Sequence, residues 1–131
     1  MIHGIGVDLQ FIPQIQEMIF RQPPRALAKI FTENEMDYCA RFRNSEQHYA
    51  ARWAVKEAFL KATGKGLTDG YRLTDIETIN MDTGQPHIVL HGKAMEDCRL
   101  HHWIVHVSIS HSGDYAIAQI ILESGEEVED G

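Results

Sequence analysis

The sequence predicts a single α+β domain in which an antiparallel sheet packs against one long helix. Three observations support this fold class. Residues 45–63 carry a sustained helical pattern, the chain after Gly70 contains short strand-like runs separated by turn residues, and no repeat, low-complexity linker or composition change divides the chain. A chain of 131 residues is long enough to form one hydrophobic core without disulfide bonds.

The chain opens with a predicted strand and a predicted helix. Residues 2–9 alternate glycine with apolar side chains and contain Asp8, which we expect at the end of a short buried strand. A helical stripe of apolar residues follows over residues 10–20, and Pro13 restricts the point at which this helix can begin.

Proline and threonine mark the helices that come next. Pro23 and Pro24 break the chain and allow a second helical start. Thr32 followed by Glu35 forms a capping-box pattern, which predicts a further short helix over residues 34–41.

The strongest helical signal covers residues 45–63. Large apolar and charged side chains recur there at three- and four-residue steps, and Gly64 and Gly66 follow, as glycines commonly do at helix C-termini. The recurring residues are Tyr49, Trp53, Lys56, Glu57, Leu60 and Lys61.

The second half of the chain predicts four strands and one helix. The expected strands cover residues 71–80, 87–90, 103–111 and 115–122, and the expected helix covers residues 92–101. We therefore expect one domain over residues 1–122. Residues 123–131 form an acidic tail without apolar periodicity, which we expect to fray.

Charge and cysteine usage exclude several classes of protein. A formal net charge of −7 argues against nucleic-acid binding. Cys39 and Cys98 lack the spacing of a zinc or redox motif, so we interpret them as ordinary buried or half-buried thiols. The N-terminal stretch lacks signal-peptide features, and no stretch is apolar enough to span a membrane, so we expect a cytoplasmic protein.

Glu57 and Lys61 are spaced i to i+4 and therefore project from one side of the long helix. One interpretation is an exposed salt bridge, which contributes about 0.3–0.5 kcal/mol. Against it, the surrounding residues are apolar or small, so a carboxylate here needs a partner. These neighbours are Trp53, Ala54, Ala58, Phe59 and Ala62.

Asp8 could supply a second carboxylate at the same place. Two converging carboxylates suit Mg²⁺, which is commonly held by one or two carboxylates together with substrate phosphates. With Lys61 added, such a site suits phosphoryl chemistry. The alternative is that Asp8 caps the helix that follows it, and spacing alone leaves both interpretations open.

The polar face of the strand over residues 103–111 is a second candidate site. His106, Ser108 and Ser110 alternate with apolar residues, so this face is either exposed to solvent or lines a ligand site. The lack of a GxSxG elbow and of a third triad member argues against a Ser-His hydrolase. The Gly64–Gly66 segment could meet a phosphate, although it is not a Walker loop.

Four segments together resemble the holo-acyl-carrier-protein synthase family: GIGVDLQFI, RWAVKEAFLKATGKG, the TGQP turn and VHVSISHSGDYAIAQIILE. Their order and spacing match the family over most of the chain. The pair of motifs G-x-D and W-x-x-K-E-A-x-x-K is specific to phosphopantetheinyl transferases, and the short length resembles the single-domain subgroup. The resemblance implies a 4′-phosphopantetheinyl transferase-like fold and Mg²⁺-dependent transfer of the 4′-phosphopantetheine group of coenzyme A to a serine of an apo-acyl carrier protein. The other product would be 3′,5′-ADP.

The resemblance also assigns roles to residues. Asp8 and Glu57 would bind Mg²⁺, Lys61 would contact the transferred phosphate, and either Glu57 or a metal-bound water would take the serine proton. In this subgroup three subunits form a ring with sites between them. Residues of the chain, some of them from a neighbouring subunit, would contact coenzyme A; they are Arg52, Lys61, Gly64, Lys65, Gly66, Pro86 and His106.

The expected protein partner is an acyl carrier protein, which is acidic and requires a basic patch. Arg21, Arg25 and Lys29 are the available cluster; the alternative is that they form a solvated helix face. Gln14 stands where many relatives place an arginine. Two other functions stay open: a module that binds coenzyme A or a carrier protein without turnover, and a structural oligomer in which Glu57 and Lys61 merely pair. The resemblance points to lipid metabolism, such as fatty acid biosynthesis, but does not choose among carrier proteins.

Overall fold

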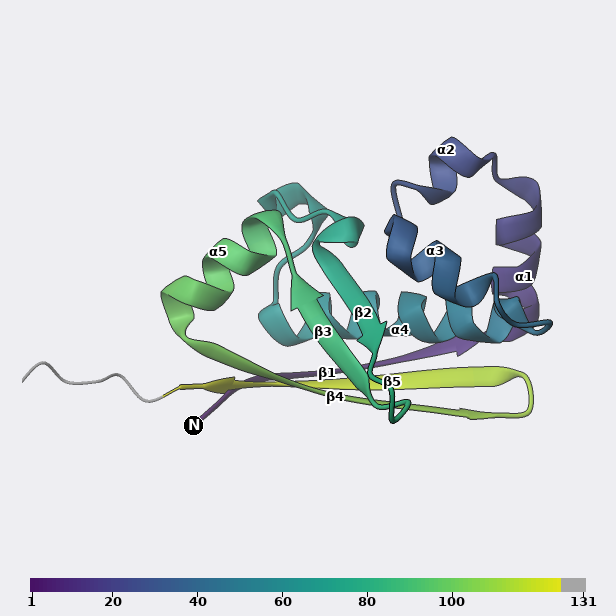
Figure 1. Cartoon of the computed structure of the whole chain (residues 1–131). Coiled ribbons are helices and arrows are strands. Elements are labelled where there is room, and N and C mark those ends of the chain that lie inside the picture. The colour runs from purple at the N-terminus through teal and green to yellow at the C-terminus, as the bar shows by residue number, and fades with distance from the viewer. Residues whose placement is uncertain (126–131) are drawn as a thin grey trace, which may run out of the picture.

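The computed structural model describes residues 1–125. Strands β1, β5 and β4 form an antiparallel three-stranded sheet in that order, and β2 and β3 form a separate antiparallel hairpin (Figure 1). The predicted α+β class with antiparallel sheets is therefore confirmed. In chain order the elements are β1 (Ile2–Phe11), α1 (Ile12–Arg21), α2 (Pro24–Leu27), α3 (Glu33–Cys39), α4 (Ser45–Thr63), the 3₁₀ helices η1 (Leu67–Asp69) and η2 (Leu73–Asp75), β2 (Ile76–Asn80), β3 (Pro86–Leu90), α5 (Gly92–His101), β4 (Trp103–Ser112) and β5 (Tyr115–Ser124).

Helix α4 lies along one face of the three-stranded sheet and packs on β1 and β5 (Figure 1). Helices α1, α2 and α3 gather at one end of α4, and α5 lies towards its other end. The main hydrophobic core fills the space between α4 and the sheet; its fully buried members include Val55, Ala58, Phe59, Ile120 and Leu122. The long helix thus forms one wall of this core.

Two glycines allow α4 to approach β1 closely. A Cβ atom at Gly4 would lie 1.9 Å from the carbonyl oxygen of Ala62, and one at Gly6 would lie 1.8 Å from that of Ala58. No larger residue fits at either position without moving the backbone. Because side chains alternate along a strand, Asp8 shares the face of these two glycines and is directed towards α4.

The long helix and the capping box are confirmed. Helix α4 has the predicted bounds and ends at Gly64 in the left-handed conformation, with φ of 70°. At the start of α3, the Glu35 amide donates to Thr32 Oγ1 at 3.2 Å, and the Thr32 amide donates to Glu35 Oε1 at 3.0 Å. Both satisfy N–H groups that a helix start leaves without partners.

The strand predicted over residues 71–80 is wrong in its first half. The chain forms η2 there, and only Ile76–Asn80 is a strand. Asp75 explains the difference, because its carboxylate accepts a hydrogen bond from the Arg72 amide at 3.0 Å and closes a turn.

The first and last strands are longer than predicted. Strand β1 runs to Phe11, so Asp8 lies inside the strand and not at its end. Strand β5 continues to Ser124, and Glu123 pairs with Ile2 on one side and Ile104 on the other. Two residues of the expected tail therefore belong to the sheet. Residues 126–131 lie outside the described part of the chain, where the expectation of fraying stays a prediction.

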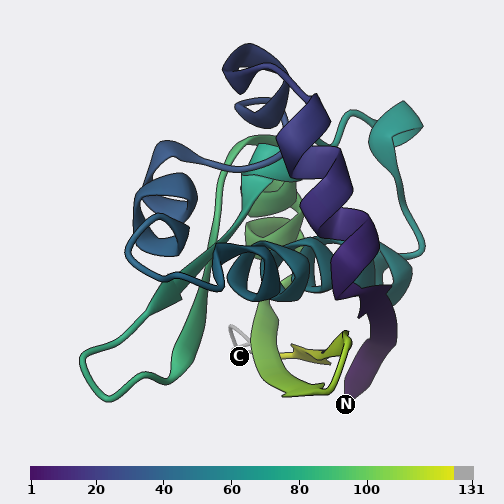
Figure 2. The same ribbon diagram turned by 90° about the vertical axis from the view of Figure 1, so that its right-hand side faces the viewer.

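The second face of the three-stranded sheet carries no described element of the chain, as both views show (Figures 1 and 2). This face is apolar along β1, where Ile5, Val7 and Leu9 are 58%, 51% and 57% exposed. The predicted polar alternation of β4 is confirmed, and it places His106 and Ser108 on the same outer face. None of the helices within residues 1–125 has the length and apolar character needed to cross a membrane.

Candidate active site

Asp8 and Lys61 meet at the contact between β1 and α4. Lys61 Nζ donates to Asp8 Oδ1 at 3.0 Å and to the Val7 carbonyl oxygen at 3.1 Å. Gln10 Nε2 donates to the other carboxylate oxygen of Asp8 at 2.5 Å. The Asp8 side chain is only 11% exposed, whereas that of Lys61 is 54% exposed. The site therefore has a fixed carboxylate from the sheet and a more accessible cation from the helix.

The structure excludes the helix-capping interpretation of Asp8. The N-cap residue of α1 is Phe11, and no side chain caps this helix in the part of the chain that is described. The carboxylate of Asp8 is instead directed to α4.

Glu57 lies one helical turn before Lys61 and is partly buried. Burial raises the pKa of Glu57, the negative charge of Asp8 raises it further, and Lys61 opposes both effects. The two carboxylates are thus close enough to repel each other. Among residues 1–125 Lys61 forms its ion pair with Asp8 and none with Glu57, so the exposed Glu57–Lys61 salt bridge is not formed.

The carboxylates of Asp8 and Glu57 suit a magnesium ion that takes its other ligands from water and substrate. They do not form a complete metal site from protein ligands alone. The described residues contain no group of three or more His, Cys, Asp or Glu side chains that could hold a metal. Asp8 and Glu57 provide two carboxylates whose mutual repulsion a cation would relieve. Mg²⁺ commonly uses one or two carboxylates and completes its shell with water and substrate phosphates, so these two residues fit it.

The segment after α4 continues from Lys61 towards η1. Lys65 is exposed, and its Nζ lies 3.9 Å from Asp97 Oδ2. Two backbone amides of the segment already donate to side chains, that of Lys65 to Thr63 Oγ1 at 3.1 Å and that of Gly66 to Asp69 Oδ2 at 2.8 Å. The segment therefore offers the exposed Lys65 side chain, which lies 3.9 Å from Asp97, and not an open nest of amides.

Arg52 and Pro86 lie together on another side of α4. Arg52 is 2% exposed, donates to Asn80 Oδ1 at 2.7 Å and places its guanidinium 4.3 Å from the centre of the Tyr38 ring. Its Nε is buried without a hydrogen-bond partner among the described residues. A hollow of about 270 Å³ opens here; its lining includes Tyr38, His48, Arg52, Asn80, Pro86 and His111.

His106 is separate from both groups. It lies on the outer face of β4, and its Nε2 is 3.1 Å from Glu123 Oε1. One chain therefore does not bring His106 together with Asp8 and Glu57, which face the helix side of the sheet.

The basic cluster lies near the end of α1. Arg21, Arg25 and Lys29 are all exposed, and Arg21 forms an ion pair with Glu17 at 2.5 Å. Beside them the Phe20 side chain is 90% exposed, which the helical stripe in the sequence did not indicate. Gln14 is also exposed on this helix.

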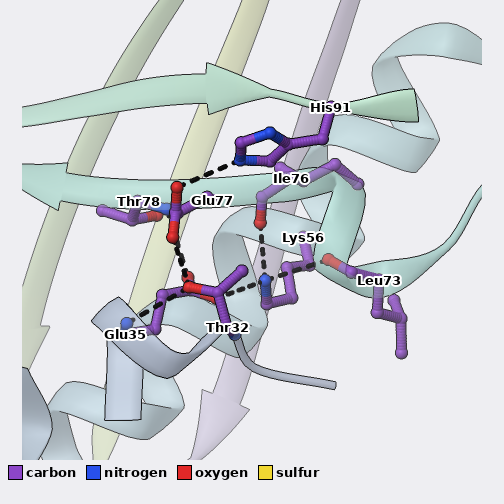
Figure 3. Close-up of polar contacts among 8 residues, drawn as sticks. All are labelled: Thr32, Glu35, Lys56, Leu73, Ile76, Glu77, Thr78 and His91. Atoms are coloured by element: carbon purple, nitrogen blue, oxygen red, sulfur yellow. Dashed lines mark hydrogen bonds and ion pairs between the residues drawn. The ribbon is translucent and has the colours of Figure 1, made fainter. Parts of the chain in front are cut away.

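The sequence interpretation missed a buried ion pair next to the site. Lys56, the neighbour of Glu57, is fully buried against Glu35 of α3 (Figure 3). The available signal was a second lysine, besides Lys61, among the small apolar residues of the helix.

Comparisons with known proteins agree with this fold. The family model of the 4′-phosphopantetheinyl transferase superfamily matches residues 4–120. The chain is 43% identical over 126 residues to a holo-[acyl-carrier-protein] synthase of Geobacter sulfurreducens, covering 94% of this chain and 98% of the relative. A relative of the same name from Syntrophus aciditrophicus is 42% identical over 124 residues, with 94% and 97% covered.

Solved structures give the same result. The holo-(acyl-carrier-protein) synthase from Bacillus anthracis, determined in complex with CoA (3′,5′-ADP), is similar with a TM-score of 0.79 and 35% identity, covering 95% of this chain and 99% of that one. The corresponding enzyme of Neisseria meningitidis has a TM-score of 0.82 at 26% identity, with 94% and 99% covered. The family suggested by the Asp8 and α4 motifs is confirmed over nearly the whole chain: this protein belongs to the 4′-phosphopantetheinyl transferase superfamily.

Proposed function

We propose that this enzyme transfers the 4′-phosphopantetheine group of coenzyme A to a serine of an apo-acyl carrier protein and releases 3′,5′-ADP. The observation that carries the proposal is the meeting of Asp8, Glu57 and Lys61 at the contact of β1 with α4. The relatives are named holo-[acyl-carrier-protein] synthases, and solved relatives hold coenzyme A or ADP.

The three residues have separate roles in this proposal. Asp8 and Glu57 would hold Mg²⁺, and the ion would neutralise charge on the substrate phosphates. Lys61 leaves Asp8 and binds the transferred phosphate as a second positive charge; its 54% exposed side chain can make this movement. The serine proton would go to Glu57 or to a water on the metal.

Coenzyme A binding involves two further regions in our proposal. Arg52 and Pro86 line the same hollow, where the guanidinium group of Arg52 supplies positive charge for an anion or a nucleotide oxygen. The Gly64–Gly66 segment contributes mainly the Lys65 ammonium group to the phosphates.

We infer that three copies of the chain form the active molecule, with sites between subunits. The support is the exposed apolar face of β1, which buries well only against another protein surface. His106 points away from the site of its own chain, so it can contribute to coenzyme A binding only in a neighbouring copy.

The carrier protein is expected to bind at the end of α1. Arg21, Arg25 and Lys29 provide positive charge on a chain whose net charge is −7, and Phe20 adds an exposed apolar anchor. Gln14 supplies no charge there, so we expect binding to depend on the other three cations. Because the relatives are named for an acyl carrier protein, we place the reaction in cytoplasmic lipid metabolism, with fatty acid biosynthesis as the expected pathway.

The decisive experiment is a transfer assay with coenzyme A, Mg²⁺ and a panel of apo-carrier proteins, read by mass spectrometry. The carrier should gain the mass of the phosphopantetheine group, and chelation of Mg²⁺ should stop the gain. Glu57→Gln should lose transfer, whereas the matched control Glu96→Gln, at an exposed position of α5, should keep it. Calorimetric binding of coenzyme A without release of 3′,5′-ADP would instead support a binding module.

A further inference from the structure

The motif on α4 contains two lysines in opposite environments. Lys61 is half exposed at the site, whereas Lys56 is 0% exposed. Lys56 Nζ donates to Glu35 Oε1 at 2.8 Å and to the carbonyl oxygens of Leu73 and Ile76 at 2.9 and 2.5 Å (Figure 3). An ammonium group has three N–H donors, so none is left for a substrate.

Glu35 is equally buried and equally satisfied. Besides Lys56, its carboxylate accepts hydrogen bonds from the amides of Thr32 at 3.0 Å and Thr78 at 3.1 Å. Thr32 Oγ1 in turn donates to Glu77, and Glu77 Oε1 lies 3.1 Å from His91 Nε2. The network therefore ties α4 to the start of α3 and to β2.

Arg52, one helical turn before Lys56, adds a second contact between α4 and β2. It donates to Asn80 at the far end of β2, so α4 is held to this strand at two successive turns. Another side of the helix is held by the close contacts of Ala58 and Ala62 with β1. Adjacent residues of an α-helix are about 100° apart around its axis, so fixing Lys56 inwards also fixes the direction of Glu57.

We propose that Lys56 is a positioning residue, whose buried contacts fix the rotation of α4 about its axis and so direct Glu57 and Lys61 towards β1. This inference rests on the proposed function for the roles of Glu57 and Lys61. It goes further by giving the two lysines of the motif different tasks, one inside the protein and one at the reacting phosphate. The competing explanation is that the pair only contributes to stability.

Two variants separate positioning from stability. Lys56→Met leaves the Glu35 carboxylate buried without a cation, which is strongly destabilising. The double variant Lys56→Met with Glu35→Gln removes both charges and keeps an amide oxygen for the backbone donors, so its melting temperature should recover towards that of the wild type. The carbonyl oxygens of Leu73 and Ile76 stay without their donor, so the rotation of α4 should not recover.

The expected result is a double variant that melts near the wild type but needs about 10- to 100-fold more Mg²⁺ for half-maximal transfer, the range seen when groups that orient metal ligands are removed. Tyr71→Phe is the matched control, because it removes a buried hydrogen bond to Asp97 that does not hold α4 to β2. It should lower the melting temperature and leave the Mg²⁺ requirement unchanged. A double variant with wild-type stability and a wild-type Mg²⁺ requirement would overturn the proposal.

Two further measurements keep the test decisive. If both methionine variants fail to fold, Lys56→Arg retains a buried cation, but a planar guanidinium cannot satisfy the same three acceptors; an unchanged Mg²⁺ requirement in this variant would overturn the proposal. NMR amide shifts of Gly6 and Val7 in β1 report the position of α4 without any activity. If the wild type transfers nothing, the proposed function fails, while changed β1 shifts in the double variant, absent from the control, still support positioning and unchanged shifts refute it.

Discussion

A Gly6→Ala substitution would place a methyl group in the narrowest part of the contact between β1 and α4. The added Cβ atom would lie 1.8 Å from the carbonyl oxygen of Ala58 and 2.8 Å from its carbonyl carbon. Ordinary contacts begin at 3.4 Å, so the strand and the helix must separate by about 1.6 Å. Both partners are backbone atoms, so no side-chain rotation can relieve the clash.

This separation should reduce both stability and activity. Overpacking a well-packed core costs about 1–3 kcal/mol, and the rigid partners place Gly6→Ala near the upper value. The same displacement moves Glu57 and Lys61 away from Asp8. A misplacement of about 1 Å in a reacting geometry can cost about 100-fold in rate, so we expect at least that loss of transfer.

Urea unfolding, followed by tryptophan fluorescence, measures the first effect, and the transfer assay below the unfolding transition measures the second. Gly66→Ala is the stability control, because a Cβ atom there meets nothing within 4 Å and φ is −152°, a conformation open to any residue. If Gly6→Ala unfolds at the wild-type urea concentration and transfers at the wild-type rate, the close contact of α4 with β1 does not position the site.

Three other predictions concern the site and the cysteines. Asp8→Asn should nearly abolish transfer with the fold retained in circular dichroism spectra, because the amide oxygen still accepts from Lys61; unchanged turnover at limiting Mg²⁺ would contradict the metal assignment. Burial and the charge of Asp8 raise the pKa of Glu57, so protonation of this group favours the folded state, and that contribution is lost as the pH rises through the folded-state pKa. Glu57→Gln should therefore raise the melting temperature of the metal-free protein at pH 7 while removing transfer, and a lower melting temperature would refute the sign. Burial raises the pKa of Cys39 to about 12, so a thiol reagent should label half-buried Cys98 first and Cys39 only on unfolding; equal labelling rates in the folded protein would be evidence against this burial.

Local patterns in the sequence were sufficient for most elements. The long helix was predicted with its correct bounds because its periodicity and its terminal glycines agree. The strand predicted to begin at Tyr71 failed because apolar residues there resemble a strand, while the decisive interaction is the bond between the Asp75 carboxylate and the Arg72 amide. Periodicity carries no information about such a bond.

The candidate site could be predicted only in part. The spacing of Glu57 and Lys61 gave them a common side of α4, but it could not show that Lys61 pairs with Asp8, because that contact joins distant parts of the chain. The prediction that Asp8 lies close to Glu57 and Lys61 came from the resemblance to the family motifs. Neither source predicted the Lys56–Glu35 pair, since a lysine in a helix is usually exposed and its partner lies on another helix.

Helix α4 explains why charged residues in one segment can have unrelated roles. One side is so close to β1 that only glycine fits opposite Ala58 and Ala62. A second side carries Lys56, whose three N–H donors all bond to acceptors in β2, η2 and α3. Lys61 lies on a third side of the helix, close to Asp8 of β1, and is half exposed. The contacts of α4 with β1 and the contacts of Lys56 together fix where Lys61 and Glu57 point. Substitutions at these contacts, although remote from the phosphates, should therefore alter the Mg²⁺ requirement.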